Sequence, residues 1–399
     1  MKIKLIDLKR QHDPIKKEMY EELDKIIEGS SFIMGENVKS FEKEFSEFLG
    51  IKNSISVGNG TDALVIALRA LGIKKDDEVI TTTYTFFASA ESIAMVGAKP
   101  VFIDVDINTF NMDVNKIEEK ITSKTKAIMA VHIFGQACDM GRINFIAKKH
   151  NLFVIEDACQ AIGAKHDGKM VGTMSDIACF SFFPTKNLGC MGDGGMIVTN
   201  NDDLATICRA FRAHGSGKDG NAAYNLLNEN KEVLQETKST DNTVYNPLKY
   251  YNYLIAYNSR LDEMQAIILR LKLKRLNEYT NSRQELAAYY DKKLAKTVLE
   301  TPKTLDESTH VYHLYILKSD NRDYIIEELG KKEIATGIYY QLPLHLQKAF
   351  EYLGYKKGDF PNSEKLSKTT FAIPMFSGMN DEEKEYISNN IMEILRNGK

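Results

Sequence analysis

The sequence lacks the features that mark disulfide-linked, zinc-binding and membrane-spanning proteins. Its five cysteines are odd in number and form no CxxC pair, which argues against a disulfide framework or a metal site and favours a reducing compartment. No apolar run approaches the ~20 residues of a membrane span, and the opening MKIKLIDLKRQHDPIKK lacks the apolar core of a signal peptide. We therefore predict a cytoplasmic protein that contacts no membrane and holds no metal.

The sequence also lacks an excess of charge of either sign. Its 52 Lys and Arg residues against 55 Asp and Glu give a formal net charge of −3, so nothing favours nucleic acid as a partner. A hydrophobic fraction of 43% over 399 residues is ordinary for a folded protein and suits one large domain with a smaller one. Any anionic ligand must therefore be bound by a local site.

Short apolar runs alternate with helical patterns from about residue 54 to residue 213, which is typical of α/β proteins. The predicted strands, several of them rich in Val and Ile, are Ser54–Val57, Glu78–Thr82, Pro100–Val105, Lys126–Val131, Leu152–Glu156, Cys179–Phe182 and Met196–Thr199. The predicted helices are Thr61–Leu71, Ala88–Val96, Asn115–Ile121, Arg142–His150 and Asp202–Arg212. We expect a mostly parallel mixed sheet between two layers of helices.

The pattern changes after residue 214. Residues 218–246 are polar, Asn-rich and weakly periodic, and only their LLNENKEVLQ stretch has a helical pattern. A strongly helical segment is predicted from Ser259 to about Leu294, and a strand-like run at His310–Leu317 follows it. The sequence therefore indicates a large domain over residues 1–261 and a smaller α+β domain over residues 262–399.

The motif GNGTD, residues 58–62, lies between a predicted strand and a predicted helix. Its glycines let the backbone approach an anion, which the N–H groups of the helix start and a hydroxyl can bind. The motif has neither the lysine of a Walker loop nor the third glycine of a dinucleotide fingerprint. A phosphate site and a simple helix cap by Thr61 or Asp62 both explain these residues.

The motif VIEDACQ places Asp157 at the carboxyl end of a buried strand, where open α/β sheets bind their ligands. A carboxylate beside a pyridine nitrogen keeps that nitrogen protonated, because an opposite charge raises its pKa by roughly 1–3 units. A protonated pyridine ring is the electron sink that pyridoxal phosphate needs. The alternative is an aspartate that caps a helix.

The motif SFFPTKNLG, which runs into GDGG, carries Lys186 just past a predicted strand. Proline and glycine turns hold this lysine away from a solvated helix face, so its amine can be desolvated enough to form an imine. An ordinary surface lysine is the alternative, and the motif disfavours it.

Together these motifs make the sequence resemble the DegT/DnrJ/EryC1/StrS type of sugar aminotransferase, within the fold-type-I aspartate aminotransferase superfamily. The resemblance covers nearly the whole chain. It is carried in order by the segments SFIMGENVKSFEKEF, GNGTDAL, YTFFASAESIAMVGAKPVFIDVD, AIMAVHIFGQACDM, IEDACQAIGAKHDGKMVGTMSDIACFSFFPTKNLGCMGDGG, AHG, AYNSRLDEMQA, HVYHLYIL, QLPLHLQKAF and AIPMFSGM. It implies a three-layer fold with a smaller α+β domain at the C-terminus.

The resemblance implies that pyridoxal 5′-phosphate is attached to Lys186, which then moves a proton between the substrate carbon and the cofactor. It implies that Asp157 pairs with the pyridine nitrogen, that Gln160 lies near the ring hydroxyl and that Phe86 stacks on the ring. The residues implied to hold the phosphate are Gly60, Thr61 and Ser181 from one subunit and Asn258 from its neighbour. The active unit would then be a homodimer with shared active sites.

For the substrate the resemblance points to Arg260, His313 and Tyr340 as groups that meet a diphosphate or a sugar hydroxyl. A surface ion pair for Arg260 and ordinary packing for His313 and Tyr340 explain the same residues.

The reaction implied is the transfer of an amino group from L-glutamate to a nucleotide-linked keto sugar. The segments SFFPTKNLG and YNSRLDEMQA resemble members that act at C3 of the sugar more than those that act at C4. We therefore expect a dTDP-linked 3-keto-6-deoxyhexose, giving a 3-amino-3,6-dideoxyhexose for a glycan such as lipopolysaccharide. A UDP-linked 3-keto sugar or a 4-keto sugar is the alternative.

The sequence departs from this family at residues 218–246, where members have a shorter connection, and we expect this insertion to line the entrance for the nucleotide sugar. A related dehydratase is disfavoured because those enzymes replace the imine lysine by histidine. A nicotinamide-dependent sugar oxidoreductase would need a glycine fingerprint that the chain does not have. A non-catalytic regulatory protein on the same fold is the remaining alternative from another class.

Overall fold

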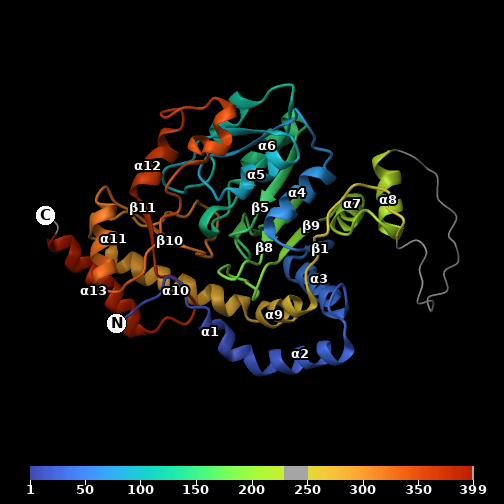
Figure 1. Cartoon of the computed structure of the whole chain (residues 1–399). Coiled ribbons are helices and arrows are strands. Elements are labelled where there is room, and N and C mark those ends of the chain that lie inside the picture. The colour runs from blue at the N-terminus through green and yellow to red at the C-terminus, as the bar shows by residue number, and fades with distance from the viewer. Residues whose placement is uncertain (229–249, 398–399) are drawn as a thin grey trace.

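The computed structural model describes residues 1–228 and 250–397, and a seven-stranded sheet lies at its centre (Figure 1). The strands are β1 (Asn53–Val57), β2 (Glu78–Thr82), β3 (Lys99–Ile103), β4 (Thr125–Val131), β5 (Phe153–Asp157), β8 (Ile177–Ser181) and β9 (Gly195–Thr199). Their order across the sheet is β1-β9-β8-β5-β4-β2-β3, and β9 alone runs against its neighbours. The predicted mostly parallel mixed sheet is confirmed.

Helices cover both faces of the sheet, because its strands are apolar on both sides. In β8, Ile177 and Cys179 belong to one apolar core while Ala178 and Phe180 belong to the other, which is the two-residue period of a strand. The first face is covered by α4 (Gly60–Ala70), α5 (Ala88–Met95) and α7 (Asp202–Arg212). The second face is covered by α3 (Glu36–Leu49), α6 (Met140–His150) and α9 (Glu263–Leu273).

A separate apolar core lies in the C-terminal part of the chain, on the left of Figure 1. It joins α10 (Leu276–Leu294), α11 (Arg322–Lys331), α13 (Asp381–Asn397) and the antiparallel pair of β10 (Tyr315–Lys318) and β11 (Thr370–Ile373). Helix α12 (Pro361–Thr369) leads directly into β11. The division at residues 261 and 262 stays a prediction.

The N-terminal segment contacts both the C-terminal core and helix α9. Ile3 lies in the C-terminal core, where its N–H donates to Glu333 O at 2.9 Å and its carbonyl accepts from Ala335 N at 3.0 Å. Leu5 O accepts from Met375 N at 3.2 Å. The short helix α1 (Lys9–His12) and then α2 (Lys16–Gly29) follow, and α2 packs on α9 through apolar side chains.

Two predicted elements differ in the structure. Residues 115–121 form no α-helix; two short 3₁₀ helices at Val114–Lys116 and Glu118–Lys120 replace it, because seven residues make less than two turns and Asp113 opens a tight turn by accepting from Asn115 N. The strand predicted at His310–Leu317 begins only at Tyr315, because Tyr312 has φ 45° and breaks the extended backbone.

The helical segment predicted from Ser259 to about Leu294 is two helices, α9 and α10, and α9 begins only at Glu263. Within the predicted insertion, residues 218–227 belong to α8 (Gly217–Leu227), although their pattern is weakly periodic. Residues 229–249, with most of the LLNENKEVLQ stretch, lie outside the described residues. Among the helices that the structure describes, none is both long enough and apolar enough to cross a membrane.

Candidate active site

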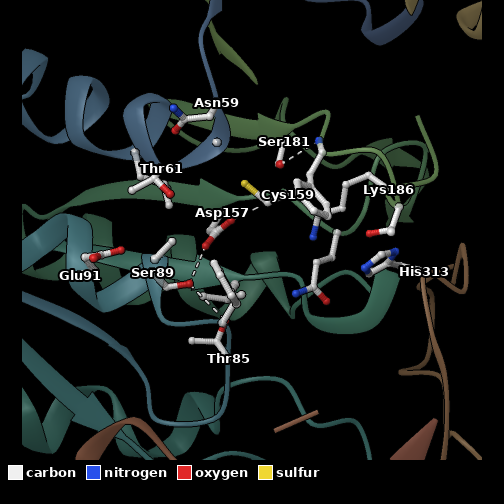
Figure 2. Close-up of a pocket in the computed structure, with 18 of the residues that line it drawn as sticks. Asn59, Thr61, Thr85, Ser89, Glu91, Asp157, Cys159, Ser181, Lys186 and His313 are labelled. Carbon is white, nitrogen blue, oxygen red and sulfur yellow. Dashed lines mark hydrogen bonds between the residues drawn. The ribbon is translucent and has the colours of Figure 1, made fainter. Parts of the chain in front are cut away.

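A cavity of about 850 Å³ opens at the carboxyl ends of β5 and β8, beside the first turns of α4 and α5 (Figure 2). This is the edge of an open α/β sheet where ligands bind. Of the eleven residues predicted for the site, nine line this cavity: Gly60, Thr61, Phe86, Asp157, Gln160, Ser181, Lys186, His313 and Tyr340. Segments that lie more than 200 residues apart in the sequence therefore meet here.

Asn258 and Arg260 are the two predicted residues that do not line this cavity. Asn258 is exposed and its backbone pairs with Ala213, while Arg260 is half-buried. The prediction places Asn258 in the site of a neighbouring subunit, so a single chain does not test it.

The start of α4 forms a cradle for an anion. Helix α4 begins at Gly60, and a Cβ on that glycine would lie 2.7 Å from Ser181 Cβ, so glycine is needed for the helix to start this close to β8. The first N–H groups of a helix have no partner within it and carry partial positive charge. Thr61 and Ser181 add hydroxyl groups to the same wall of the cavity.

The helix cap is Asn59, not Thr61 or Asp62. Asn59 Oδ1 accepts a hydrogen bond from Asp62 N at 2.8 Å. The Asp62 carboxylate accepts from Ser259 Oγ at 2.5 Å, and that oxygen in turn accepts from Gly58 N at 2.9 Å. The capping alternative for Thr61 is therefore wrong, and its hydroxyl is left to face the cavity.

Asp157 ends β5 and reaches the cavity floor with only 5% of its surface exposed. Ser89 Oγ donates to its Oδ2 at 2.7 Å and Cys159 N donates to its Oδ1 at 3.3 Å. Thr85 Oγ1 lies 3.1 Å from Ser89 Oγ. Ser89, in the first turn of α5, orients the carboxylate, and Thr85, three residues before α5, contacts Ser89; the sequence motifs did not single out either residue.

The neighbouring Glu156 points to the opposite side of β5, as the alternation of a strand requires. It is fully buried and accepts hydrogen bonds from His132 Nε2 at 3.0 Å, Gly172 N at 2.8 Å and Ser175 Oγ at 2.8 Å. Burial opposes its charge, but these hydrogen bonds outweigh burial and lower the pKa of Glu156. Glu156 therefore anchors the strand and is not available to a ligand.

Lys186 follows β8 in a loop that turns back at once, with its own N–H donating to Phe183 O at 2.8 Å. Within the part of the chain that the structure describes, its amine donates no hydrogen bond to a protein group. Burial lowers the pKa of Lys186, and the nearby Cys159 and Asp157 oppose this shift. The amine therefore lies in the cavity with an increased neutral fraction, which is what a nucleophile or a base requires.

Gln160 and Tyr340 form one side of the cavity. Gln160 Nε2 donates to Tyr340 Oη at 3.0 Å, and Gln160 Oε1 accepts from Phe134 N at 2.9 Å. The Tyr340 ring stacks on Phe134 with a centroid separation of 6.3 Å, and burial raises the pKa of Tyr340. Phe86 lies across from this pair and is 57% exposed, so its ring offers a free aromatic face.

His313 lies beside Lys186 and is 6% exposed (Figure 2). Burial and the charge of Lys186 lower the pKa of His313 well below its usual range, so the ring is neutral. Its Nδ1 is buried and has no hydrogen-bond partner among the described residues. His313 therefore presents a neutral ring to the cavity beside Lys186.

These residues fit pyridoxal phosphate. The glycine-dependent cradle at α4 suits a phosphate, the carboxylate of Asp157 suits a pyridinium, the exposed ring of Phe86 suits a planar face, and Lys186 supplies an amine. The cavity volume is also in the usual range for a cofactor site.

Two similar proteins match over almost their whole length. A "pleiotropic regulatory protein" of Geobacillus stearothermophilus is 45% identical over 99% of each chain. A dTDP-3-amino-3,6-dideoxy-alpha-D-galactopyranose transaminase of Aneurinibacillus thermoaerophilus is 40% identical over 96% of this chain and 97% of its own. Others that match over at least 93% of this chain are named as aminotransferases or transaminases of UDP- or dTDP-linked sugars.

Among solved structures, DesV of S. venezuelae in complex with a ketimine intermediate superposes with a TM-score of 0.89, at 30% identity over 98% of each chain. The sequence pattern of one protein family matches residues 13–392. The predicted fold and the predicted resemblance are thereby confirmed, and the chain belongs to the DegT/DnrJ/EryC1/StrS aminotransferase family.

Proposed function

We propose that this chain transfers the amino group of L-glutamate to C3 of a dTDP-linked 3-keto-6-deoxyhexose in the cytoplasm, giving a 3-amino-3,6-dideoxyhexose for a glycan such as lipopolysaccharide. The family establishes the coarser activity: the chain is a pyridoxal-phosphate-dependent sugar aminotransferase, as predicted. The observation that carries the proposal is the cavity in which Lys186, Asp157 and the cradle at α4 meet. The choice of sugar is supported by the 40% identity to a transaminase named for a dTDP-3-amino-3,6-dideoxy sugar.

Pyridoxal phosphate, when bound, supplies an electron sink that makes the carbon beside the amino group acidic. Gly60, Thr61 and Ser181 would hold its phosphate and Phe86 its ring. Asp157 would face the pyridine nitrogen, with its carboxylate oriented by Ser89. Gln160 would lie near the ring hydroxyl, although both ends of its amide already have protein partners.

Lys186 would attach the cofactor and then carry the proton. Its Nζ would take a proton from the amino-bearing carbon of glutamate and, in the second half, would give one to the sugar carbon that receives the amino group. The lowered pKa of this amine supports the role, because a base must be neutral before it accepts a proton. Over both halves, glutamate becomes its 2-oxo acid and the C=O of the sugar becomes CH–NH₂, so the oxygen of one and the amino group of the other are exchanged with no net gain or loss of water.

The sugar nucleotide would meet His313 and Tyr340 inside the cavity. The neutral ring of His313, which lines the cavity beside Lys186, supports a contact with the substrate. Arg260 lies outside the cavity of its own chain and would act from the cavity rim or from a second subunit. A homodimer would also bring Asn258, exposed in its own chain, to the phosphate of the neighbouring site.

One other acceptor and one other function each have specific support. A UDP-linked 3-keto sugar is supported by a relative named as UDP-N-acetyl-3-dehydro-alpha-D-glucosamine 3-aminotransferase, at 38% identity. A regulatory function is supported by the 45% identity to a protein named as pleiotropic regulatory. The described site residues favour catalysis, because a protein that only binds the cofactor does not need a lysine of lowered pKa within the cavity.

Absorbance spectroscopy tests the proposal. We expect a visible band for the cofactor on Lys186, its loss on adding glutamate, and its return with one keto sugar from a panel of dTDP- and UDP-linked 3-keto and 4-keto sugars. The Lys186→Ala variant should lose turnover by roughly 10²–10⁴-fold, as expected for loss of a general base. A band that responds to no amino donor contradicts the proposal and favours the regulatory function.

A further inference from the structure

Lys272 in α9 is a buried lysine that lines no part of the cavity. Its side chain is fully buried, and its Nζ donates to Gly189 O at 2.6 Å. No ion pair joins it to a carboxylate in the described part of the chain. Burying an ammonium without a counter-ion costs free energy, so packing alone does not explain a lysine here.

The carbonyl that Lys272 binds belongs to the loop that carries Lys186. We call residues 183–193 the lysine loop. Two backbone hydrogen bonds close the loop. Lys186 N donates to Phe183 O at 2.8 Å, and Cys190 N donates to Phe182 O, just before the loop, at 2.9 Å. A Cβ on Gly189 would lie 2.4 Å from Pro184 O, so the loop is tightly packed at the residue whose carbonyl Lys272 binds. A displacement of Gly189 is therefore passed on to Lys186, three residues away.

A second side chain of α9 holds the same loop. Gln265 Oε1 accepts from Met191 N at 2.8 Å, and a Cβ on Gly192 would lie 3.0 Å from Gln265 Nε2. Residues 265 and 272 are seven apart and therefore lie on one face of the helix, two turns from each other. On its other side the loop is tied to Val311 O by Asn187 Nδ2 at 2.8 Å.

The N-terminal segment closes the space around Lys272. The pKa of His12 falls to about 4, first because His12 is buried and second because the charge of Lys272 lies nearby. Burial also lowers the pKa of Lys272, to about 8, with Cys190 opposing the shift. Ile15 and Met19 pack on Ile268 of α9 and fix the helix in place. Among the described residues, the amine of Lys272 thus has one hydrogen-bond partner, the Gly189 carbonyl.

We propose that Lys272 and Gln265 are positioning residues for Lys186: from one face of α9 they hold the lysine loop and so set where the Lys186 amine lies in the cavity. The proposal rests on the proposed function of Lys186. Neither residue touches the cavity, so their effect reaches the cofactor only through the loop.

The test is the rate at which apo protein attaches pyridoxal phosphate. It is followed by the visible band in a stopped-flow mixer and confirmed by borohydride trapping and the mass of the Lys186 peptide. We expect Lys272→Met and Gln265→Met, which keep an unbranched side chain of similar length and remove the polar contact, to attach the cofactor about ten-fold more slowly. The control is Lys274→Met, an exposed lysine one residue beyond α9, which should attach at the wild-type rate.

The thermal unfolding midpoint of each apo variant separates positioning from stability. A folded Lys272→Met protein that attaches the cofactor at the wild-type rate overturns the proposal, whatever its unfolding midpoint. If Lys272→Met does not fold, the rate at which Gln265→Met attaches the cofactor tests the proposal in its place. Wild-type protein that attaches no cofactor at Lys186 would instead contradict the proposed function.

Discussion

Gly60 shows how a single residue without a side chain shapes the site. A Cβ at this position would lie 2.7 Å from Ser181 Cβ and 3.1 Å from Cys159 Sγ, neither of which is the end of a flexible side chain. We expect Gly60→Ala to push the start of α4 away from β8 and to weaken pyridoxal phosphate binding about ten-fold, or about 1.4 kcal/mol. Titration of the apo protein with the cofactor measures this. Gly330→Ala, with nothing within 4 Å of its Cβ, is the control, and equal affinity in both variants would count against the cradle.

At the same scale, the sequence predicts the residues that follow strands and carry motifs, but not those that orient them. Asp157, Lys186 and Gly60 each stand just past a strand in a recognisable motif, and the cavity brings them together. Ser89 could not be found in this way, because it precedes Asp157 by 68 residues and a serine in a short helix has no distinctive pattern. Its function depends on how α5 packs against the sheet, which the sequence does not state.

Glu156 supports a prediction about acid stability. Its pKa is lowered in the folded protein, so its contribution to stability is complete above the unfolded value near 4.5 and is lost as the pH falls through the folded value. Glu156→Gln places an amide against four N–H or O–H donors, and we expect it to lower the free energy of unfolding at pH 7 by about 3 kcal/mol.

Urea unfolding of the apo protein at pH 7 and again below pH 4 measures this contribution. The difference between the wild type and Glu156→Gln should narrow at the lower pH, because the wild-type carboxylate is then being protonated. Glu285→Gln, at an exposed position, should differ little from the wild type at either pH. If the difference in free energy of unfolding between the wild type and Glu156→Gln does not change with pH, the shape of the amide, and not the loss of charge, explains the lower stability.

At the scale of elements, helix α3 depends on α9 for its cap. The residue before α3 is Gly35, which has no side chain to cap it, and Glu263 of α9 accepts instead from Asn37 N at 2.9 Å and Val38 N at 3.0 Å. Glu263 is 1% exposed. We expect Glu263→Ala to lower the free energy of unfolding by about 1–3 kcal/mol, since it removes a cap and leaves buried donors.

The same urea titration compares Glu263→Ala with Glu285→Ala, an exposed glutamate on α10 that should change the free energy by no more than about 0.5 kcal/mol. Similar values for the two variants would mean that the first turn of α3 finds other partners. This cap joins two helices that are more than 200 residues apart, so the sequence around either helix gives no sign of it.

Elements were predicted well where local pattern decides them and poorly where distant partners do. The seven strands of the sheet agree with the predicted ranges to within about two residues, because each is an apolar run buried on both faces. The segment from residue 310 has the same composition but not the same structure. Val311 N donates to Gly135 O, a contact with a distant residue that only the folded chain provides.

At the scale of the whole molecule, the shared active site proposed above predicts complementation between two inactive variants. A chain with Lys186→Ala keeps Asn258, and a chain with Asn258→Ala keeps Lys186. In a mixed dimer one of the two sites then has both residues, so purified mixed dimers should regain about half of wild-type activity. Co-expression with two different tags and an assay of the doubly purified protein checks this. No recovery would show that each chain builds its site alone.

The pairing of Ile3 with Glu333 and Ala335, and of Leu5 with Met375, has a consequence for synthesis on the ribosome. Residues 3 and 5 find these partners only after more than 300 further residues have been added. At about 5–20 residues per second this takes roughly 20 to 60 seconds. During that time the apolar Ile3 has no core to enter, so the C-terminal part of the molecule can close only after its last strand has been released.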